Sequence, residues 1–520
     1  MSYFSNEERF RYLKSKSKDI SSLLEKEMTL ISGDFWGIQK FIFYGLSTKN
    51  ASKVLRAKSA FIQIFTEYIT RYICDYFGVD EKYIISKSAG KFEILIPKKE
   101  IDIEPIQKSI DNYFKDNFYA INGIVLSTIS SSNMKDKFLK EDSYKRLRDT
   151  TIPNQVEKDK FNKFKLLNHS YLLEYDTNIN NQELCRVCNI RKIDKDEACK
   201  ICNQFRELGQ KLTKREVQHF RADFLDGFVV SIELNKKIKS YIPRQKDKYE
   251  ALNFEEIAQN SCQGGDKGIK ALAVLKADVD DMGKFLREHA DITKKFENFD
   301  RFSQGLDAFF SEYIVDKLRE KESKFRNIYT VFTGGDDLFL IGAWDEILEF
   351  SRFIRDEFRV YVNNKLTISF GIAIAKPTTP ISYLADYTEH LLEDAKGIDG
   401  KKEVKNPKDA ISLFKETVKW DEYKSINRQL ERFYKIKDEL NTSTLYSLLE
   451  IANMAIRFKY KRDDFKIRDA LWKSKMRYLF NRNINSEYYD LIPLLDDSLK
   501  DYPKATKIFL SEFIYKRRKA

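Results

Sequence analysis

The stretch "IKALAVLKADVDDMGKFLREH", residues 269–289, sets an apolar run directly before three aspartates and a helical pattern. The run from Leu272 to Leu275 has the character of a buried strand, and a helix is predicted from Phe285 onward. Further along, "IYTVFTGGDDLFLIGAW", residues 328–344, places two glycines and two aspartates between apolar flanks: Gly334, Gly335, Asp336 and Asp337. Because two glycines suit a tight turn with positive φ, this stretch predicts a two-stranded hairpin.

The segments after the hairpin complete a β-α-β-β-α-β order. Residues 344–358 predict a helix, residues 365–375 a strand, and residues 382–397 a further helix. This order is the ferredoxin-like arrangement, in which the first strand and the hairpin are central neighbours. The end of the first strand therefore meets the hairpin turn, and we expect four aspartates to gather there: Asp278, Asp280, Asp336 and Asp337.

Such a carboxylate cluster is unfavourable unless divalent cations bridge its members. Hard oxygen ligands predict Mg²⁺ or Mn²⁺, and two such ions would activate an attacking hydroxyl and neutralise a leaving phosphate. Since residues two apart on a strand share a face, Asp278 and Asp280 can act together, whereas Asp336 and Asp337 diverge unless the turn twists them. Asp278 and Asp336 are therefore the strongest candidates, and Asp337 is the third catalytic candidate.

Other interpretations of these motifs are weaker. A Gly-Gly-Asp-Asp turn alone is often only a polar hairpin tip, but here a second acidic strand end is predicted beside it. A calcium loop fails because Met282 and His289 stand where oxygen ligands are needed. The chain contains no G-x4-G-K-[ST] match, so phosphate-loop chemistry is disfavoured.

Four cysteines form a C-x2-C, ten-residue, C-x2-C pattern: Cys185, Cys188, Cys199 and Cys202. Each x2 pair can bring two thiolates onto one ion, so the spacing predicts a zinc site. Four thiolates leave no open position for water or substrate, which makes this zinc structural. Cys74 and Cys262 stand alone and are interpreted as packing residues.

The N-terminal part repeats the same pattern. Residues 29–43, "TLISGDFWGIQKFIF", match the acidic strand end, and residues 85–97, "ISKSAGKFEILIP", match the hairpin. Gly90 and Lys91 fall where Gly-Asp stands in the second copy, and Trp36 falls where Asp280 does, so the first copy cannot assemble the same metal site.

The first copy is more plausibly a partner that holds a second nucleotide. In "SKVLRAKSAF", residues 52–61, the candidate phosphate contacts are Arg56, Lys58 and Ser59. The alternative is that these residues belong to an ordinary amphipathic helix face.

Composition limits the class of protein. The net charge of +12 favours a polyanionic partner, although a solvated lysine-rich surface explains it as well. No apolar run approaches the roughly 20 residues of a membrane span, and the charged N-terminus is not followed by an apolar core. We therefore expect a cytoplasmic protein that uses no membrane.

The predicted fold class is α+β, with two ferredoxin-like domains, an intervening four-cysteine zinc module and a C-terminal helical bundle. The expected domains are a helical lead-in over residues 1–26, the degenerate first copy over 27–150, a helical domain with the zinc module over 151–262, the second copy over 263–415 and a helical domain over 416–520. Apolar residues at steps of three and four from about residue 419 onward indicate the helical bundle.

Together these motifs resemble the large subunit of type III CRISPR effector complexes, most closely the Csm-type (subtype A) branch. The resemblance spans essentially the whole chain, and it implies that each ferredoxin-like domain is a palm of the polymerase and nucleotide-cyclase type. It implies that Gly334 and Gly335 form the turn of a cyclase site whose acidic residues are Asp278, Asp336 and Asp337. Lys396, in "EDAKGIDGKK", resembles the lysine that such cyclases direct at triphosphates, with a solvated helix end as the alternative.

The resemblance further implies an activity and partners. Bound to CRISPR RNA and the other subunits of the complex, such a protein converts ATP into cyclic oligoadenylate messengers when target RNA is captured. Many members begin with an HD-type nuclease domain, but this sequence has only four histidines and no His-Asp dipeptide. We therefore expect no cleavage of single-stranded DNA by this chain.

Two other function classes remain open. One is a non-catalytic, RNA-binding scaffold subunit in which the acidic cluster is structural. The other is a related nucleotidyltransferase that makes a different messenger, such as a cyclic dinucleotide or an AMP conjugate of S-adenosylmethionine. The mass of the product, or its absence, separates these classes.

Overall fold

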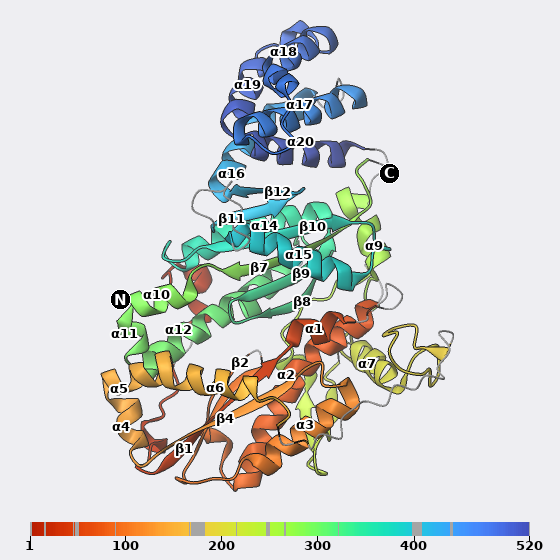
Figure 1. The fold of residues 1–520 in the computed structure, drawn as a ribbon. Coiled ribbons are helices and arrows are strands. Elements are labelled where there is room, and N and C mark those ends of the chain that lie inside the picture. Colours follow the sequence, from red (N-terminus) through yellow and green to blue (C-terminus); the bar gives the residue numbers. More distant parts are fainter. Residues whose placement is uncertain are drawn as a thin grey trace.

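The computed structural model describes residues 3–518 with gaps at 15–16, 45, 47–50, 89, 166, 168–182, 215, 246–249, 265–266, 321, 398–407 and 437–439. The molecule has three tiers along its long axis, with the N-terminal palm at the bottom of Figure 1, the second palm in the middle and the C-terminal helices at the top. The cysteine-containing segment lies at the side of the lower tier.

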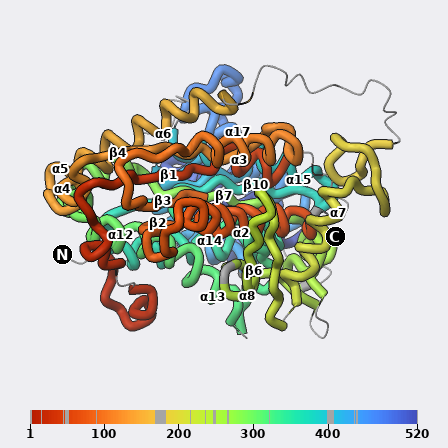
Figure 2. Tube along the Cα trace, turned by 90° about the horizontal axis from the view of Figure 1, so that it is seen from below, coloured from red at the N-terminus to blue at the C-terminus, as the bar shows by residue number. Residues whose placement is uncertain are grey.

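The first palm is a four-stranded antiparallel sheet in the order β2-β3-β1-β4. Figure 2 shows these four strands one after another in this order. Its strands are β1 (Met28–Trp36), β2 (Ile84–Ser88), β3 (Lys91–Ile96) and β4 (Gly123–Ser131). Helix α2 (Ala51–Phe77) connects β1 to β2, and α3 (Glu104–Phe118) connects β3 to β4. This is the ferredoxin-like order that the sequence predicts.

The second palm repeats this topology and extends it. Its sheet has the order β12-β11-β10-β7-β9-β8, and the four strands of the ferredoxin-like part are β7 (Leu272–Val279), β8 (Ile328–Gly334), β9 (Asp337–Ala343) and β10 (Ile368–Ala375). The hairpin of β11 (Ala410–Leu413) and β12 (Glu416–Lys419) adds two strands that the sequence analysis does not predict. The predicted domain boundary at residues 415–416 falls inside this hairpin.

Both faces of the second sheet are buried, which explains its nearly continuous apolar strands. On β7, Ala273, Leu275 and Ala277 belong to one hydrophobic core. Leu272 and Val274 belong to the other. The first core lies under α12 (Phe296–Ala308), the π-helical η7 (Phe309–Tyr313), α13 (Ile314–Arg319) and α14 (Trp344–Tyr361). The second face is covered by α15 (Ile381–Lys396) and by helices of the first palm.

The two palms share that second core. Phe43, the last residue of α1 (Ile38–Phe43), packs against Phe339 of β9 with ring centroids 4.6 Å apart. Ser59 of α2 donates its hydroxyl to the carbonyl of Val331 on β8. The relative position of the palms is therefore fixed by buried contacts.

The other face of the first sheet carries a smaller core under a layer of short helices. These helices are α4 (Met134–Leu139), α5 (Glu141–Arg146), the π-helical η4 (Leu147–Thr151) and α6 (Ile152–Phe161). Phe296 of α12 joins this core, so the layer also contacts the second palm.

The N-terminal segment contains two 3-10 helices, η1 (Glu8–Leu13) and η2 (Ser21–Leu23), where the sequence predicts a helical lead-in. Phe10 of η1 packs against Tyr313 and Tyr361, with ring centroids 5.0 and 5.1 Å apart. This segment therefore completes the core of the second palm, although it precedes the first palm in the chain.

The remaining elements fall into two groups. After the cysteines the chain forms α7 (Lys200–Lys211), β5 (His219–Ala222), β6 (Val230–Glu233), α8 (Leu234–Lys237), α9 (Phe254–Gln259) and η6 (Ser261–Gly264), and α10 (Met282–Glu288) and α11 (Ala290–Thr293) follow β7. The short η3 (Glu81–Tyr83) lies between α2 and β2 of the first palm. The C-terminal tier consists of α16 (Trp420–Gln429), η8 (Glu431–Ile436), α17 (Thr442–Tyr460), η9 (Ile467–Leu471), α18 (Trp472–Asn483), η10 (Ser486–Tyr488), α19 (Leu491–Asp501) and α20 (Pro503–Arg517). The predicted helical C-terminal region is therefore present.

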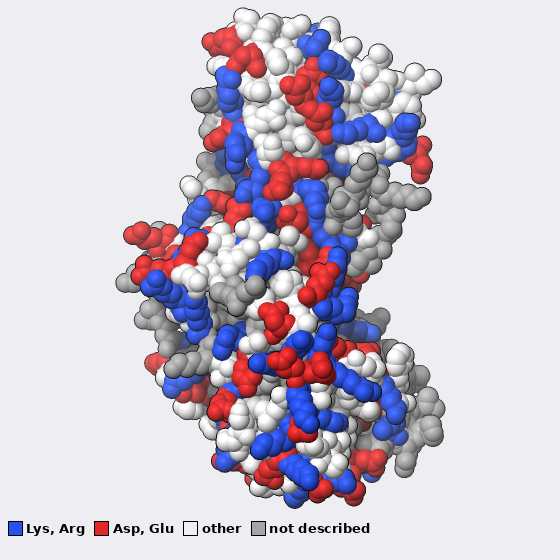
Figure 3. All heavy atoms as spheres, turned by 90° about the vertical axis from the view of Figure 1, so that its left-hand side faces the viewer, with Lys and Arg blue, Asp and Glu red and all other residues white. Residues whose placement is uncertain are grey.

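Charge is mixed on the face seen in Figure 3, where Lys and Arg are interspersed with Asp and Glu along the whole length of the molecule. That face does not present a uniformly basic surface. Among the described residues, no helix combines the length and apolar character that a membrane span requires.

Candidate active site

The predicted meeting of strand end and hairpin turn is present in the second palm. Strand β9 pairs with both β7 and β8, so Asp337 lies opposite Asp278 on one side and opposite Gly334 on the other. Gly335 has a φ of 65°, the left-handed conformation that glycine tolerates best, while Gly334 ends strand β8. Only one of the two glycines therefore supplies the positive φ of the turn.

Three of the four predicted aspartates come together. Carboxylate oxygens of Asp278, Asp336 and Asp337 lie within 4.8 Å of one another. Burial, and then the neighbouring charge of Asp336, raise the pKa of Asp337 to about 6. The site thus concentrates negative charge that a bound cation would offset.

Lys396, at the C-terminal end of α15, reaches this cluster. Its ammonium group forms an ion pair with Asp278 and donates to the carbonyl of Val279 at 3.3 Å. Burial lowers the pKa of Lys396 to about 8, with smaller contributions from Lys408 and Lys276. Of the two interpretations offered by the sequence, the solvated helix end does not fit this placement.

Asp280 does not join the cluster, and its prediction as a metal ligand does not fit this geometry. Its buried carboxylate accepts hydrogen bonds from the hydroxyls of Thr367 at 2.7 Å and Ser369 at 2.8 Å, and from the backbone N–H of Asp409 at 2.9 Å. Asp278 and Asp280 were expected to share a face because residues two apart on a strand point the same way. Strand β7 ends at Val279, so this alternation does not extend to Asp280. Asp280 instead ties the end of β7 to β10.

Asp336 and Asp337 of the cluster line a cavity of about 840 Å³ between the two palms, whereas Asp278 lies next to them outside its lining. The second palm contributes the hairpin turn, and the first palm contributes the end of β1 and its own hairpin. The basic residues that line the cavity are Lys40, Lys91, Arg148, Lys160 and Lys276. A cavity of this size lies within the range of small-molecule sites, and its lysines and arginines suit an anionic ligand.

The first palm reproduces the backbone of the site with different charges. Asp34 lies opposite Lys91, in the register where Asp278 lies opposite Asp337. Lys160 of α6 forms an ion pair with Asp34, at 2.9 Å. Among the described residues, the only groups of three or more candidate metal ligands are the four cysteines and the aspartate cluster of the second palm.

The structure places none of the three predicted phosphate contacts of α2 at the cavity. Arg56 donates to the carbonyl of Gly209 at 3.0 Å, and Lys58 donates to the carbonyls of Phe41 at 3.0 Å and Tyr44 at 3.3 Å. Burial lowers the pKa of Lys58 to about 8. With Ser59 bonded to β8, all three residues are buried structural contacts because α2 is covered on both sides.

The basic residues that line the cavity are not among those predicted from the sequence. Lys91 carried a usable signal, since the repeat aligns it with the aspartates of the second turn. Lys160 and Arg148 lie on helices outside the repeat, and nothing in their local sequence distinguishes them from other charged helix residues. Lys276 lies within an apolar strand and pairs with Glu389 of α15, an arrangement that only the fold reveals.

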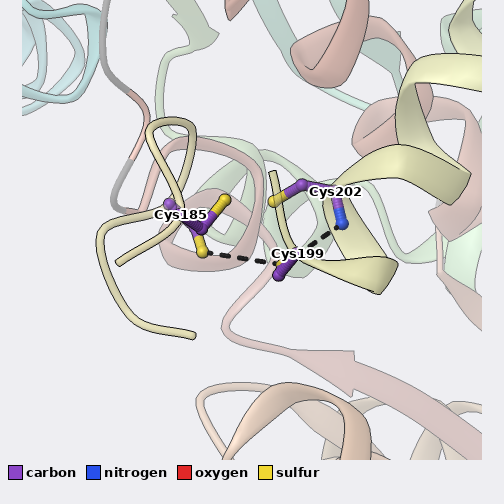
Figure 4. Close-up of side chains that lie close together, drawn as sticks. Cys185, Cys199 and Cys202 are labelled. Atoms are coloured by element: carbon purple, nitrogen blue, oxygen red, sulfur yellow. Dashed lines mark hydrogen bonds between the residues drawn. The ribbon is translucent and has the colours of Figure 1, made fainter. Parts of the chain in front are cut away.

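The four cysteines of the predicted zinc module come together and are all buried (Figure 4). The sulfur atoms of Cys188 and Cys199 are 4.0 Å apart, and the backbone N–H of Cys202 donates to the sulfur of Cys199. Two such knuckles provide four thiolates with no further ligand position, which fits a structural tetrahedral ion.

Helix α7, which begins after Cys199, attaches this module to the first palm, and Figures 1 and 2 both show it alongside α2. At Gly209 the helices approach so closely that an added Cβ would lie 2.2 Å from the carbonyl oxygen of Lys53. Arg191 donates to the carbonyl of Asn117 at the end of α3, at 2.5 Å. The module therefore stabilises the helices that cover the first sheet.

Comparison with known families gives two matches. Residues 271–405 match the family model described as the second palm domain of Cas10/Cmr2. Residues 27–178 match the model described as Csm1 subunit domain B.

Curated relatives include Cas10/Csm1 proteins of subtype III-A, named CRISPR system single-strand-specific deoxyribonucleases. The protein from Streptococcus thermophilus is 24% identical over 86% of this chain, and that from Thermococcus onnurineus is 26% identical over 89%. The chain spans 63% and 66% of the lengths of these two relatives, respectively.

Solved structures of Csm1-Csm4 cassettes share the fold. One in complex with one ATP superposes with a TM-score of 0.69, and one in complex with cA3 with a TM-score of 0.68. Each match covers 95% of this chain and 70% of the other at 20% identity. At that identity the likeness establishes the fold.

We expect Cys188→Ser to lower the zinc content and the yield of soluble protein, because binding of a structural zinc ion is coupled to folding. Metal analysis of the purified chain and the soluble fraction on expression measure the two effects. Cys262→Ser is the control, since Cys262 lies outside the cluster and should leave zinc content unchanged. Full zinc content in Cys188→Ser would contradict the assignment.

We expect Lys58→Met to lower the melting temperature of the chain by several degrees. The substitution leaves the carbonyls of Phe41 and Tyr44 without their donor, and each unsatisfied buried group costs about 1–3 kcal/mol. Thermal unfolding followed by circular dichroism measures the change. Lys53→Met, at an exposed position of the same helix, is the control, and equal melting temperatures of the two variants would refute the structural role of Lys58.

Proposed function

Because the chain belongs to the Cas10/Csm1 family of type III CRISPR subunits, we propose that it is a nucleotidyltransferase that converts ATP into cyclic oligoadenylates. The observation that carries this proposal is a cluster of three carboxylates, two of which, Asp336 and Asp337, line a cavity between the two palms. The first palm and its covering helices supply most of the basic residues of that cavity, and the second palm supplies Asp336 and Asp337. Such a division suits two nucleotides held side by side.

The donor set fits Mg²⁺ or Mn²⁺. Asp278, Asp336 and Asp337 offer only carboxylate oxygens, and their closeness together with the raised pKa of Asp337 reflects charge that a cation would offset. Divalent ions held there would supply activation of a ribose hydroxyl and charge neutralisation at the leaving pyrophosphate. The four cysteines would hold a structural Zn²⁺ ion remote from this chemistry.

The basic residues of the cavity bind and orient polyphosphate in this proposal. Lys276 is buried in the sheet and Lys91 lies at the first hairpin, and both stabilise the ionised form of Asp337 through their charge. Lys396 forms an ion pair with Asp278. When bound cations balance the charge of that carboxylate, Lys396 is free to bind a phosphate group instead.

Each bond formed in the proposed reaction is matched by a bond that breaks. The 3′ oxygen of one nucleotide attacks the α-phosphorus of the next, a P–O bond forms, the bond to pyrophosphate breaks, and the hydroxyl proton passes to solvent. A final attack within the chain closes the ring and releases the last pyrophosphate. No redox partner or additional cosubstrate is required.

The known proteins support the substrate and the partners. Complexes of Csm1-Csm4 cassettes with ATP and with cA3 share this fold, which favours adenine nucleotides here. The partners we propose are CRISPR RNA, target RNA and the other subunits of a type III effector complex, with activity switched on by capture of target RNA. We place the assembly in the cytoplasm.

Deoxyribonuclease activity appears in the names of the curated relatives. This chain contains no His-Asp dipeptide, and its lack of that activity stays a prediction.

We expect the double variant Asp336→Ala, Asp337→Ala to lower product formation about a thousandfold or more, since it removes two of the three candidate metal ligands. Mass spectrometry of products formed from ATP by the assembled complex with target RNA measures the effect. Retained synthesis would refute the site. No nucleotide product from the unsubstituted complex would favour the scaffold interpretation, and a product of another mass would indicate a different messenger.

Asp281→Asn is the matched control for this experiment. Asp281 follows the same strand end, but its carboxylate pairs with Lys408 and lies outside the cluster. It should retain nearly full synthesis, whereas zinc content should be unchanged in all of these variants.

We expect Lys91→Met to weaken ATP binding by about tenfold to a hundredfold, the equivalent of one charge-assisted hydrogen bond to phosphate. Isothermal titration of the full chain with ATP and Mg²⁺ measures the dissociation constant. Lys98→Met, an exposed lysine beyond the other end of β3, is the control. Equal affinities of the two variants would exclude Lys91 from the nucleotide site.

A further inference from the structure

Asp307 contacts the hairpins of both palms at once. It lies near the end of α12, and Figure 1 shows this helix on the side of the second palm that faces the first. One carboxylate oxygen accepts the backbone N–H of Gly335 at 3.0 Å and the hydroxyl of Ser88 at 3.1 Å. Gly335 lies in the turn between β8 and β9, and Ser88 ends strand β2, so a single oxygen atom joins the two hairpins.

The position of Asp307 relative to the cavity separates it from residues that would touch a ligand. Ser88, Gly335, Asp336 and Asp337 line the cavity, whereas Asp307 is not among its lining residues. Asp307 therefore supports both hairpins from behind. Gly335, which Asp307 contacts, directly precedes Asp336 in the chain, and Asp336 is one of the three clustered carboxylates.

The helix that carries Asp307 changes its hydrogen-bonding geometry two residues after this position. Directly after Ala308 the α-helix changes to the π-helical turn η7. Ser311 of this turn donates its hydroxyl to the second carboxylate oxygen of Asp307 at 3.2 Å. Single π-turns within helices occur frequently at functional sites, and here the turn holds the carboxylate with one oxygen directed to the hairpins.

We propose that Asp307 is a positioning residue that couples the geometry of the metal cluster to the spacing of the two palms, an inference that rests on the proposed function. A movement of the first palm is transmitted through Ser88 and Asp307 to Gly335, and from there to Asp336. The clasp formed by Ser88, Asp307 and Gly335 thus links binding between the palms to the arrangement of the catalytic carboxylates.

The chemistry of the clasp makes it effective. Hydrogen bonds to an ionised carboxylate are roughly twice as strong as neutral ones. Apart from this clasp, the hairpin tip is held by its own strands and by the N–H of Val279, which donates to the carbonyl of Asp336, and the side chain of Asp336 is exposed. Because displacement of reacting groups by about 1 Å can reduce a rate a hundredfold, loss of the anchor affects turnover more than affinity for the nucleotide.

The negative charge of Asp307 offers a competing explanation, since it lies close to an acidic cluster. Asparagine separates the two explanations. Asp307→Asn keeps a carbonyl oxygen that can accept from Gly335 and Ser88, and its amide group can donate to Ser311. A positioning role predicts rescue by asparagine, and a role of the charge predicts none.

The experiment compares Asp307→Ala, Asp307→Asn and Ser88→Ala with the control Ser311→Ala. The control removes a bond to the same carboxylate but touches neither hairpin. Binding of Mn²⁺ to the full chain in the presence of ATP is measured by electron paramagnetic resonance. The kcat and KM for ATP are measured in the complex with target RNA.

We expect Asp307→Ala to weaken Mn²⁺ binding and to lower kcat, each by about tenfold or more, with KM changed less than threefold. Asp307→Asn and Ser311→Ala should stay within threefold of the unsubstituted chain. Ser88→Ala should lower kcat by a smaller factor, and this factor should vanish when Ala already replaces Asp307, because the two residues act through one contact. Equal values for Asp307→Ala and Ser311→Ala would overturn the proposal, and so would failure of Asn to rescue.

The outcomes also separate this inference from the proposed function. If the unsubstituted complex makes no nucleotide product, the proposed function fails, while the Mn²⁺ measurement still tests the clasp. If Asp307→Ala has a lowered zinc content or melting temperature, Ser88→Ala decides the result. In that case an unchanged Mn²⁺ affinity and kcat in Ser88→Ala overturn the proposal.

Discussion

The first palm covers one face of the second sheet, and the rest of the molecule depends on that burial. The face of the second sheet that carries Phe339 would expose a large apolar surface if the palms separated, and α1 and α2 cover it instead. This contact determines where the first hairpin lies relative to the second. The cavity between the hairpins is therefore a consequence of core packing, and its dimensions are set by residues that never touch it.

Burial also explains which parts of the site were predictable from the sequence. Strand β7 and its hairpin partner were evident from apolar runs and glycines, and their pairing followed from the order of elements, so Asp278, Asp336 and Asp337 were found. Asp280 was misplaced because no sequence pattern shows that the strand ends one residue earlier. Lys58 was misplaced because an amphipathic pattern does not show that both sides of α2 are covered by other elements. Lys58 is therefore buried, and it donates to the carbonyl of Phe41 in α1 and not to a ligand.

The pseudo-symmetry of the palms shows how a single backbone serves two electrostatic purposes. Both hairpins accept the same backbone hydrogen bond from the neighbouring strand: the N–H of Phe35 donates to the carbonyl of Gly90 in the first palm, and the N–H of Val279 donates to the carbonyl of Asp336 in the second. In the first palm Lys91 lies opposite the strand-end aspartate Asp34, and Lys160 forms an ion pair with it, so the charge is compensated within the protein. In the second an aspartate faces it, and compensation is left to Lys396 or to a cation. The repeat therefore keeps its geometry while the charge opposite the strand-end aspartate changes from positive to negative.

A site assembled from two domains needs a means to keep its halves in register, and apolar packing alone does this weakly because its energy is not directional. The directional contacts lie around the cavity. Asp307 ties the turn of β8 and β9 to the end of β2, and so joins the two palms. Asp280 ties the end of β7 to β10 within the second palm. Arg148 supports the opposite side, with its guanidinium 4.1 Å from the centroid of Phe299. Arg148 lies within the π-helical turn η4, and Asp307 lies two residues before the π-helical turn η7. The helices therefore depart from regular geometry at the places where they hold the two palms together.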